Sequence, residues 1–132
     1  MGSEKFTFTG HAGDALSARL DRPDGPTRAV ALFAHCFTCG KDIAAARRIA
    51  EDLALAAAAM AARGLAPGLL IGHSLGGAAV LAAAGRMPSV RAVATLAAPA
   101  DPAHVLHNFA GDLPRIAADG VAEVSLGGRM IA

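Results

Sequence analysis

A serine flanked by two glycines is the residue pattern with the clearest chemical meaning in this chain. Residues 71–78 read IGHSLGGA, and the spacing Gly72-x-Ser74-x-Gly76 lies between an apolar run and a run of small residues. This pattern is typical of a sharp strand-to-helix turn that exposes the serine hydroxyl. At the start of such a helix the N–H of Leu75 points at a developing oxyanion. We therefore predict a nucleophilic Ser74, because the context on both sides argues against a chance match in a glycine-rich chain.

A pair of cysteines is the second pattern that can carry chemistry. Cys36 and Cys39 stand in AHCFTCGK, residues 34–41. A C-x-x-C beside a strand–helix–strand pattern is typical of thioredoxin-like redox proteins. A zinc site needs about four ligands, whereas the two cysteines and His35 make only three nearby groups. Redox chemistry, metal binding and a purely structural loop are three readings of this pair.

The elements that must position these residues follow from hydrophobic periodicity. The alternating segments KFTFTG and ALSARL predict a hairpin, and apolar runs such as RAVALFA predict strands buried on both faces of a parallel sheet. We expect strands over residues 5–10, 15–20, 28–34, 68–72 and 90–96, and helices over 41–66 and 75–86. Gly64 is expected to end the first helix. A weaker helix from about residue 103 and a short hairpin around the turn at 127–128 complete the expected elements.

This order of elements predicts the fold class. Strands that alternate with helices indicate an α/β domain, in which a parallel sheet carries helices on both faces. An antiparallel hairpin precedes that sheet. With 132 residues the chain is short for the architecture, and we expect a single domain over residues 1–132.

The overall composition argues against several classes of partner. The net charge is +1, from 12 Lys and Arg against 11 Asp and Glu, so we expect neither nucleic acid nor a membrane surface as partner. The most apolar run, residues 53–62, is far shorter than the stretch of about 20 residues that a bilayer needs. The N-terminal residues show no signal-peptide pattern, and only two cysteines are present. We therefore expect a cytoplasmic protein.

Four segments together resemble the α/β-hydrolase superfamily, and most of all the serine-hydrolase domain that bacteria fuse to osmotically-inducible-protein-C domains. The specific segments are ALFAHCFTCGKDIAAARRIAEDLA and LLIGHSLGGAAVLAAA, and the supporting ones are FTFTGHAGDALSARLDRPDG and VRAVATLAAPADPAHVLHNF. The resemblance implies a serine hydrolase of carboxylic esters or related acyl compounds. It implies a small-molecule substrate, no cofactor and no metal. Peroxide chemistry is not part of what it implies.

The resemblance also implies an oxyanion hole. In such proteins the loop after the strand expected at 28–34 supplies the second amide of the hole. Phe37 takes that place here, so its N–H is expected to act together with the N–H of Leu75. Main-chain amides do this work, which leaves Cys36 as a small packing residue beside the nucleophile. On this reading the cysteine pair is structural.

A base and an acid are implied by residue order. Asp101 follows the strand expected at 90–96, and His104 and His107 come next. This gives the order Ser…Asp…His that is usual for the fold. We expect His107 or His104 to act as the base and Asp101 to orient it. The alternative is that both histidines are surface residues of a loop and a helix.

Two departures from the family pattern bear on activity. Cys36 and Ser74 are 38 positions apart, where the family has a helix, a further strand and another helix. About one strand–helix unit of roughly 30 residues is therefore absent, with a junction of two helices expected near Leu55-Ala56. The absent strand would lie beside the strand at 28–34, and pairing of two copies through that exposed edge would cover it. We expect the later strands that carry the acid and the histidine in the family to be missing too, so a partial, catalytically inactive domain that binds a partner is an alternative.

Overall fold

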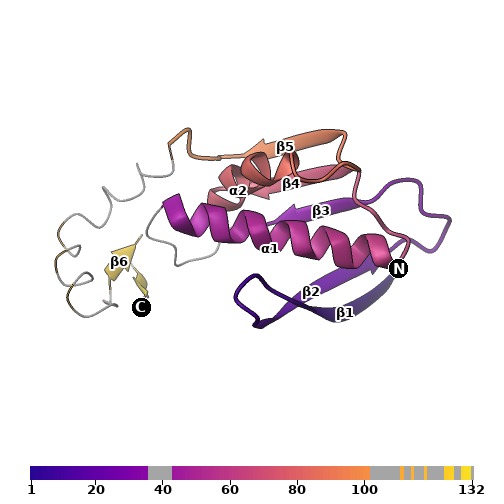
Figure 1. Cartoon of the computed structure of the whole chain (residues 1–132), viewed down its shortest axis with the longest axis horizontal. Coiled ribbons are helices and arrows are strands. Elements are labelled where there is room, and N and C mark those ends of the chain that lie inside the picture. The colour runs from indigo at the N-terminus through magenta and orange to yellow at the C-terminus, as the bar shows by residue number, and fades with distance from the viewer. Residues whose placement is uncertain are drawn as a thin grey trace.

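The computed structural model describes residues 1–35, 43–101, 111, 114, 118, 124–126 and 129–131. Its elements are, in chain order, β1 (Gly2–Thr9), β2 (Ala15–Arg22), β3 (Ala31–Ala34), α1 (Ile43–Ala62), β4 (Leu69–His73), α2 (Leu75–Ala84), β5 (Ala92–Leu96), β6 (Val124–Leu126) and β7 (Arg129–Ile131). The strands form two antiparallel pairs, β1–β2 and β6–β7, and a parallel sheet of order β3-β4-β5. Figure 1 shows the long helix α1 lying between the hairpin β1–β2 and the strands of the parallel sheet.

The N-terminal hairpin is longer than the sequence predicted. β1 and β2 pair along their whole length, and half-buried Phe6 and Phe8 alternate with exposed residues on β1. The two rings contact each other with centroids 6.4 Å apart. On β2, Asp21 accepts a 3.0 Å hydrogen bond from Arg19 Nε, and this bond, with a second from Ser3, holds the pKa of Asp21 below its usual value. Such cross-strand and same-face polar contacts extend pairing beyond the apolar core of the hairpin.

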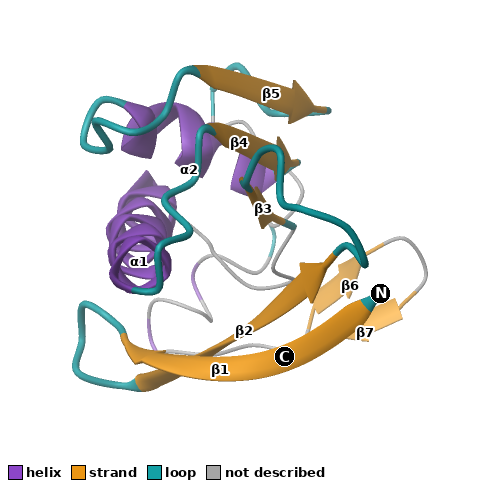
Figure 2. Cartoon of the chain, turned by 90° about the vertical axis from the view of Figure 1, so that its right-hand side faces the viewer, coloured by secondary structure: helices purple, strands orange, loops and turns teal. Residues whose placement is uncertain are grey.

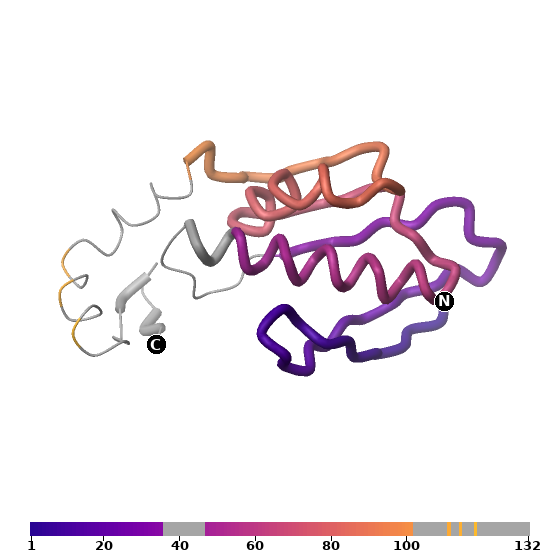
Figure 3. Tube along the Cα trace, viewed as in Figure 1, coloured from indigo at the N-terminus to yellow at the C-terminus, as the bar shows by residue number. Residues whose placement is uncertain are grey.

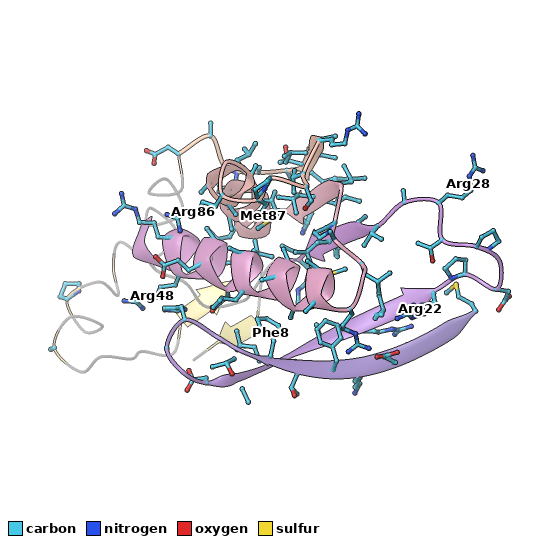
Figure 4. All side chains as sticks on the ribbon, turned by 45° about the vertical axis from the view of Figure 1, so that its right-hand side comes forward. Phe8, Arg22, Arg28, Arg48, Arg86 and Met87 are labelled. Carbon is cyan, nitrogen blue, oxygen red and sulfur yellow. The ribbon has the colours of Figure 1, made fainter. Side chains whose placement is uncertain are left out.

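The hairpin is attached to helix α1. Asp52 Oδ1 on the helix accepts a 2.8 Å hydrogen bond from the backbone N–H of His11, and it lies 3.0 Å from His11 Nδ1. Just after the C-terminal end of the helix, Arg63 pairs with Glu4 and lies over the ring of Phe6, 4.8 Å from its centroid. The hairpin runs along α1 in Figure 3, and Figure 4 shows Phe8 between the two elements. Polar contacts in the middle of α1 and just after its C-terminal end therefore fix the hairpin to the helix.

The parallel sheet carries both described helices on one face. Leu32, Leu70 and Val93 are side by side in the register of β3, β4 and β5, and all three pack into the core under the helices. Figure 2 shows α1 and α2 together on this side. Both crossovers, β3–α1–β4 and β4–α2–β5, step in the same direction across the sheet. Since such crossovers are almost always right-handed, both helices must lie on the same face.

Small residues form most of the core. The buried cluster consists of Ala34, Ala50, Leu53, Ala57, Leu70, Ala79, Val80, Ala83 and Met87. Met87 follows α2 and lies beside both helices (Figure 4). Alanines at facing positions let the helix backbones approach each other and the sheet closely, which fits the composition of five Phe and no Trp or Tyr. The core gains its stability from close packing rather than from large side chains.

Helix α1 is a single unbroken helix, although the sequence pattern changes near Leu55-Ala56. Alanine has the highest helix propensity, so the alanine-rich second half continues the first half without a break. The helix ends at Ala62, and Gly64 adopts φ +75° after it. The N–H of Leu65 donates to Met60 and that of Gly64 donates to Ala61, both at 2.9 Å, which is the Schellman pattern. The expected helix end at Gly64 is thus shifted only slightly.

The other face of the parallel sheet is open among the described residues. Phe33 on β3 is 55% exposed and Leu96 on β5 is 54% exposed, while Ile71 between them on β4 is half-buried. The second helical layer expected from the sequence is not found in residues 1–35 and 43–101. The helix expected from about residue 103 falls almost wholly outside the described residues. Of the described strands, none pairs with the outer edge of β3, because the hairpin forms a sheet of its own.

Within the described ranges, no helix combines the length and the apolar character needed to cross a membrane.

Candidate active site

Ser74 makes the whole connection between strand β4 and helix α2. The strand ends at His73 and the helix begins at Leu75. Ser74 adopts φ 55° and ψ −125°, a combination that side-chain-bearing residues rarely adopt. Such a backbone conformation costs about 1–3 kcal/mol and persists only where the surroundings enforce it. The side chain of Ser74 therefore stands on a strained turn at the carboxyl end of the sheet.

The neighbouring glycines show what enforces this turn. A Cβ on Gly72 would lie 2.4 Å from the carbonyl oxygen of Gly76 and 2.6 Å from the Cα of Gly77. A Cβ on Gly76 would lie 2.4 Å from the carbonyl oxygen of Ala34. All of these are backbone atoms, which cannot rotate away as a flexible side chain can. Only glycine allows the strand, the turn and the first turn of the helix to meet this closely.

The first turn of α2 contacts the end of β3. The Cβ built on Gly76 would also lie 2.9 Å from the carbonyl oxygen of His35, the last described residue before Ile43. Leu75 is buried at the first position of the helix. The first four N–H groups of a helix have no acceptor within it and carry a partial positive charge. The N–H of Leu75 is thus one of the helix-end donors beside Ser74.

The end of strand β5 holds the turn from the other side. The N–H of Ser74 donates to the carbonyl of Leu96 at 2.9 Å, and the carbonyl of Ser74 accepts from Gly77 at 2.9 Å. Beyond Leu96, Ala97 adopts φ 50°, and Ala98 lies against Gly77, where an added Cβ would be only 2.6 Å from that of Ala98. The sequence did not reveal these residues, since nothing about an alanine indicates a positive φ.

Comparison with known proteins finds similarity among the solved structures. No protein-family model matches the chain, and no curated protein does. Among solved structures, the crystal structure of the esterase domain from a Rhodothermus marinus protein matches with 45% sequence identity and a TM-score of 0.66. The match covers 81% of this chain and 55% of that one, so the chain spans little more than half of the esterase domain's length.

This chain has an esterase-like α/β fold. The predicted fold class, a parallel α/β sheet with an N-terminal antiparallel hairpin, is confirmed by the neighbour and by the elements themselves. The closer resemblance to domains fused with osmotically-inducible-protein-C domains stays a prediction.

The structure describes only part of the site expected from the sequence. It brings together Ser74, Leu75, Gly72 and Gly76 at one turn. Asp101 is exposed and follows β5 by five positions. The remaining expected residues, which are Phe37, Cys36, Cys39, His104 and His107, lie outside the described residues. The roles given to them from the sequence therefore stay predictions.

Metal binding was one of three readings of the cysteine pair, and both cysteines lie outside the described residues. Over the described part of the chain, no three His, Cys, Asp or Glu side chains lie close enough together to hold a metal ion.

Proposed function

We propose that this chain hydrolyses carboxylic esters or related acyl compounds, with Ser74 as the nucleophile. The observation that supports this most is the backbone of Ser74, held at φ 55° between a strand and a helix by glycines that contact neighbouring backbone atoms. A turn of this kind exposes a serine hydroxyl above the carboxyl edge of a parallel sheet. The esterase domain that shares 45% of its aligned residues with the chain supports a hydrolase-like function.

In this proposal the Ser74 hydroxyl oxygen attacks the carbonyl carbon of the ester. A base takes the hydroxyl proton, and the carbonyl oxygen becomes an oxyanion. The proton then passes to the leaving alcohol as the ester C–O bond breaks, which leaves an acyl group on Ser74. Water, deprotonated by the same base, releases the acid and restores the serine. His107 or His104 would be the base, and Asp101 would orient it.

The oxyanion would accept hydrogen bonds from the N–H groups of Leu75 and Phe37. Removing one such donor typically costs about 2.7–4 kcal/mol of transition-state stabilisation. The placement of Leu75 at the start of α2 supports its role, because the helix end is electrically positive. The close approach of Gly76 to Ala34 and His35 supports the role of Phe37 as the second donor. His35 lies beside the turn, and Phe37 follows it by two positions in the sequence.

The alanine-rich helices favour a short-chain substrate. The chemistry requires neither a metal nor a cofactor, and we propose that the protein acts in the cytoplasm on a small molecule, with no nucleic acid or membrane as partner.

The proposal is tested by turnover of p-nitrophenyl esters of increasing acyl length. We expect hydrolysis by the folded wild type, fastest for the shortest acyl groups, and loss of turnover in Ser74→Ala. Ser17→Ala is the matched control, since Ser17 lies on the exposed face of β2, and it should hydrolyse the esters as the wild type does. A folded wild type without turnover would instead favour the inactive, partner-binding domain.

A further inference from the structure

Two residues share an unusual backbone conformation at the same edge of the sheet. Ser74 and Ala97 are the non-glycine residues with positive φ, at 55° and 50°, among those the structure describes. Ser74 follows β4, Ala97 follows β5, and the last pair of that parallel ladder is His73 with Leu96. The two residues therefore occupy equivalent positions, each one step beyond the ladder. The two neighbouring strands β4 and β5 are thus each followed directly by a residue with positive φ, a conformation that residues other than glycine rarely adopt.

A hydrogen bond links the two turns. The N–H of Ser74 donates to the carbonyl of Leu96 at 2.9 Å. That carbonyl belongs to the peptide group between Leu96 and Ala97, and the φ angle of Ala97 sets the direction of this group relative to the chain that follows. With φ at 50°, the carbonyl can stay aligned with Ser74 while the chain beyond it turns away from the strand direction.

The chain after Ala97 turns onto the first turn of helix α2. Ala98 is half-buried and contacts Gly77, where an added Cβ would lie 2.6 Å from the Cβ of Ala98 and 3.3 Å from its Cα. Gly77 in turn donates its N–H to the carbonyl of Ser74 at 2.9 Å. Ser74 is thus held through its N–H by Leu96, which precedes Ala97, and through its carbonyl by Gly77, which Ala98 contacts.

Nothing at Ala97 itself accounts for its conformation. Its side chain is exposed, so no packing of the methyl group selects this φ. A left-handed conformation at an alanine is unfavourable, and such strain persists where surrounding contacts enforce it, often at functional sites. The contacts that enforce it here are the two that reach Ser74 and Gly77.

We propose that Ala97 is a positioning residue whose left-handed turn holds Ser74 in its strained conformation. Its role in catalysis rests on the proposed function of Ser74. The effect of Ala97 on the backbone is independent of that function, because the hydrogen bond from the Ser74 N–H to the Leu96 carbonyl can be measured in an inactive protein.

The test compares three substitutions of Ala97 with a control in the same strand. Ala97→Gly and Ala97→Asn tolerate positive φ, whereas Ala97→Val does not, because a β-branched side chain is excluded from this region. Ala92→Val places the same side chain at the exposed start of β5, in ordinary strand conformation. Two quantities are measured in each folded variant: amide hydrogen exchange at Ser74 by NMR, and the rate of covalent labelling of Ser74 by a fluorophosphonate.

We expect Ala97→Val to raise the exchange rate of the Ser74 amide by about tenfold or more and to slow labelling by a similar factor. The glycine, asparagine and control variants should stay within about twofold of the wild type in both. A purely structural role would lower global stability without this selective change at Ser74. Wild-type exchange at Ser74 in a folded Ala97→Val variant would overturn the proposal.

The asparagine variant keeps the test decisive if the valine variant does not fold. Asparagine brings a side chain of similar bulk that is compatible with the turn, so it must preserve protection of the Ser74 amide. A loss of protection of about tenfold in that variant would overturn the proposal. If the wild type is not labelled at all, the proposed function of Ser74 fails, and amide exchange alone decides the role of Ala97.

Discussion

An alanine at Gly76 is predicted to push the first turn of helix α2 away from the end of strand β3. Its Cβ would lie 2.4 Å from the carbonyl oxygen of Ala34 and 2.9 Å from that of His35. Real Cβ atoms essentially never come closer than 3.0 Å to a heavy atom outside their own residue and its chain neighbours, so the two elements must separate by at least 0.6 Å. Both atoms belong to the backbone, and no side-chain rotation can relieve the contact.

This displacement sets the expected magnitudes. Overpacking of a closely packed site costs about 1–3 kcal/mol of unfolding free energy, and we expect about 2–3 kcal/mol here because backbone must move. The same movement displaces Ser74 and the N–H of Leu75 relative to the end of β3 and His35. A misplacement of about 1 Å at reacting groups costs on the order of 100-fold in rate. Labelling of Ser74 by a fluorophosphonate should therefore slow by roughly two orders of magnitude.

Chemical denaturation and the second-order labelling rate measure the two effects. Gly85→Ala is the matched control at the other end of the same helix, because Gly85 has φ −66° and an added Cβ would meet nothing within 4 Å. It should raise the unfolding free energy by about 0.4–1 kcal/mol and leave labelling unchanged. A Gly76→Ala protein with wild-type stability and wild-type labelling would refute the steric account of the turn.

Three further predictions concern other parts of the chain. Asp52→Ala removes both contacts with His11, which should lower the unfolding free energy by about 1–2 kcal/mol in denaturation experiments; no change would mean that the contact does not hold the hairpin. Replacing Cys36 and Cys39 together by serine should leave Ser74 labelling within about twofold of wild type, whereas loss of labelling would show that a thiol is required. We propose that two copies pair through the edge of β3, so Phe33→Thr should shift sedimentation toward the monomer with less than about 0.5 kcal/mol change in stability. A dimer that survives this substitution would exclude a pairing that buries the Phe33 side chain.

Periodicity predicted which elements exist, and less well where they end. The alternation of Phe6 and Phe8 located the first strand of the hairpin, but pairing extends to Gly2 because polar residues also take part in the ladder. Gly64 marked the end of α1, since a left-handed residue there completes the Schellman hydrogen bonds. An apolar strand does not indicate which of its faces is covered. The exposure of Phe33 could therefore not be predicted from the sequence.

The turn at Ser74 could be predicted because it requires glycine at fixed positions, and this requirement is visible in the sequence. Gly72 and Gly76 must be glycines at that spacing, and the contacts they make in the structure give the reason. Ala97 left no such signal. It lies between Leu96, whose carbonyl accepts from the N–H of Ser74, and Ala98, which contacts Gly77 on helix α2, and neither contact is encoded in the local sequence.

The most direct test of the central claim is to locate the residue that a fluorophosphonate modifies in the folded protein. Intact mass spectrometry followed by peptide mapping gives both the number of adducts and their position. We expect a single adduct on Ser74, formed by the wild type, absent after denaturation and absent from Ser74→Ala. A folded wild type that takes up no label, or an adduct carried by a residue other than Ser74, would contradict it.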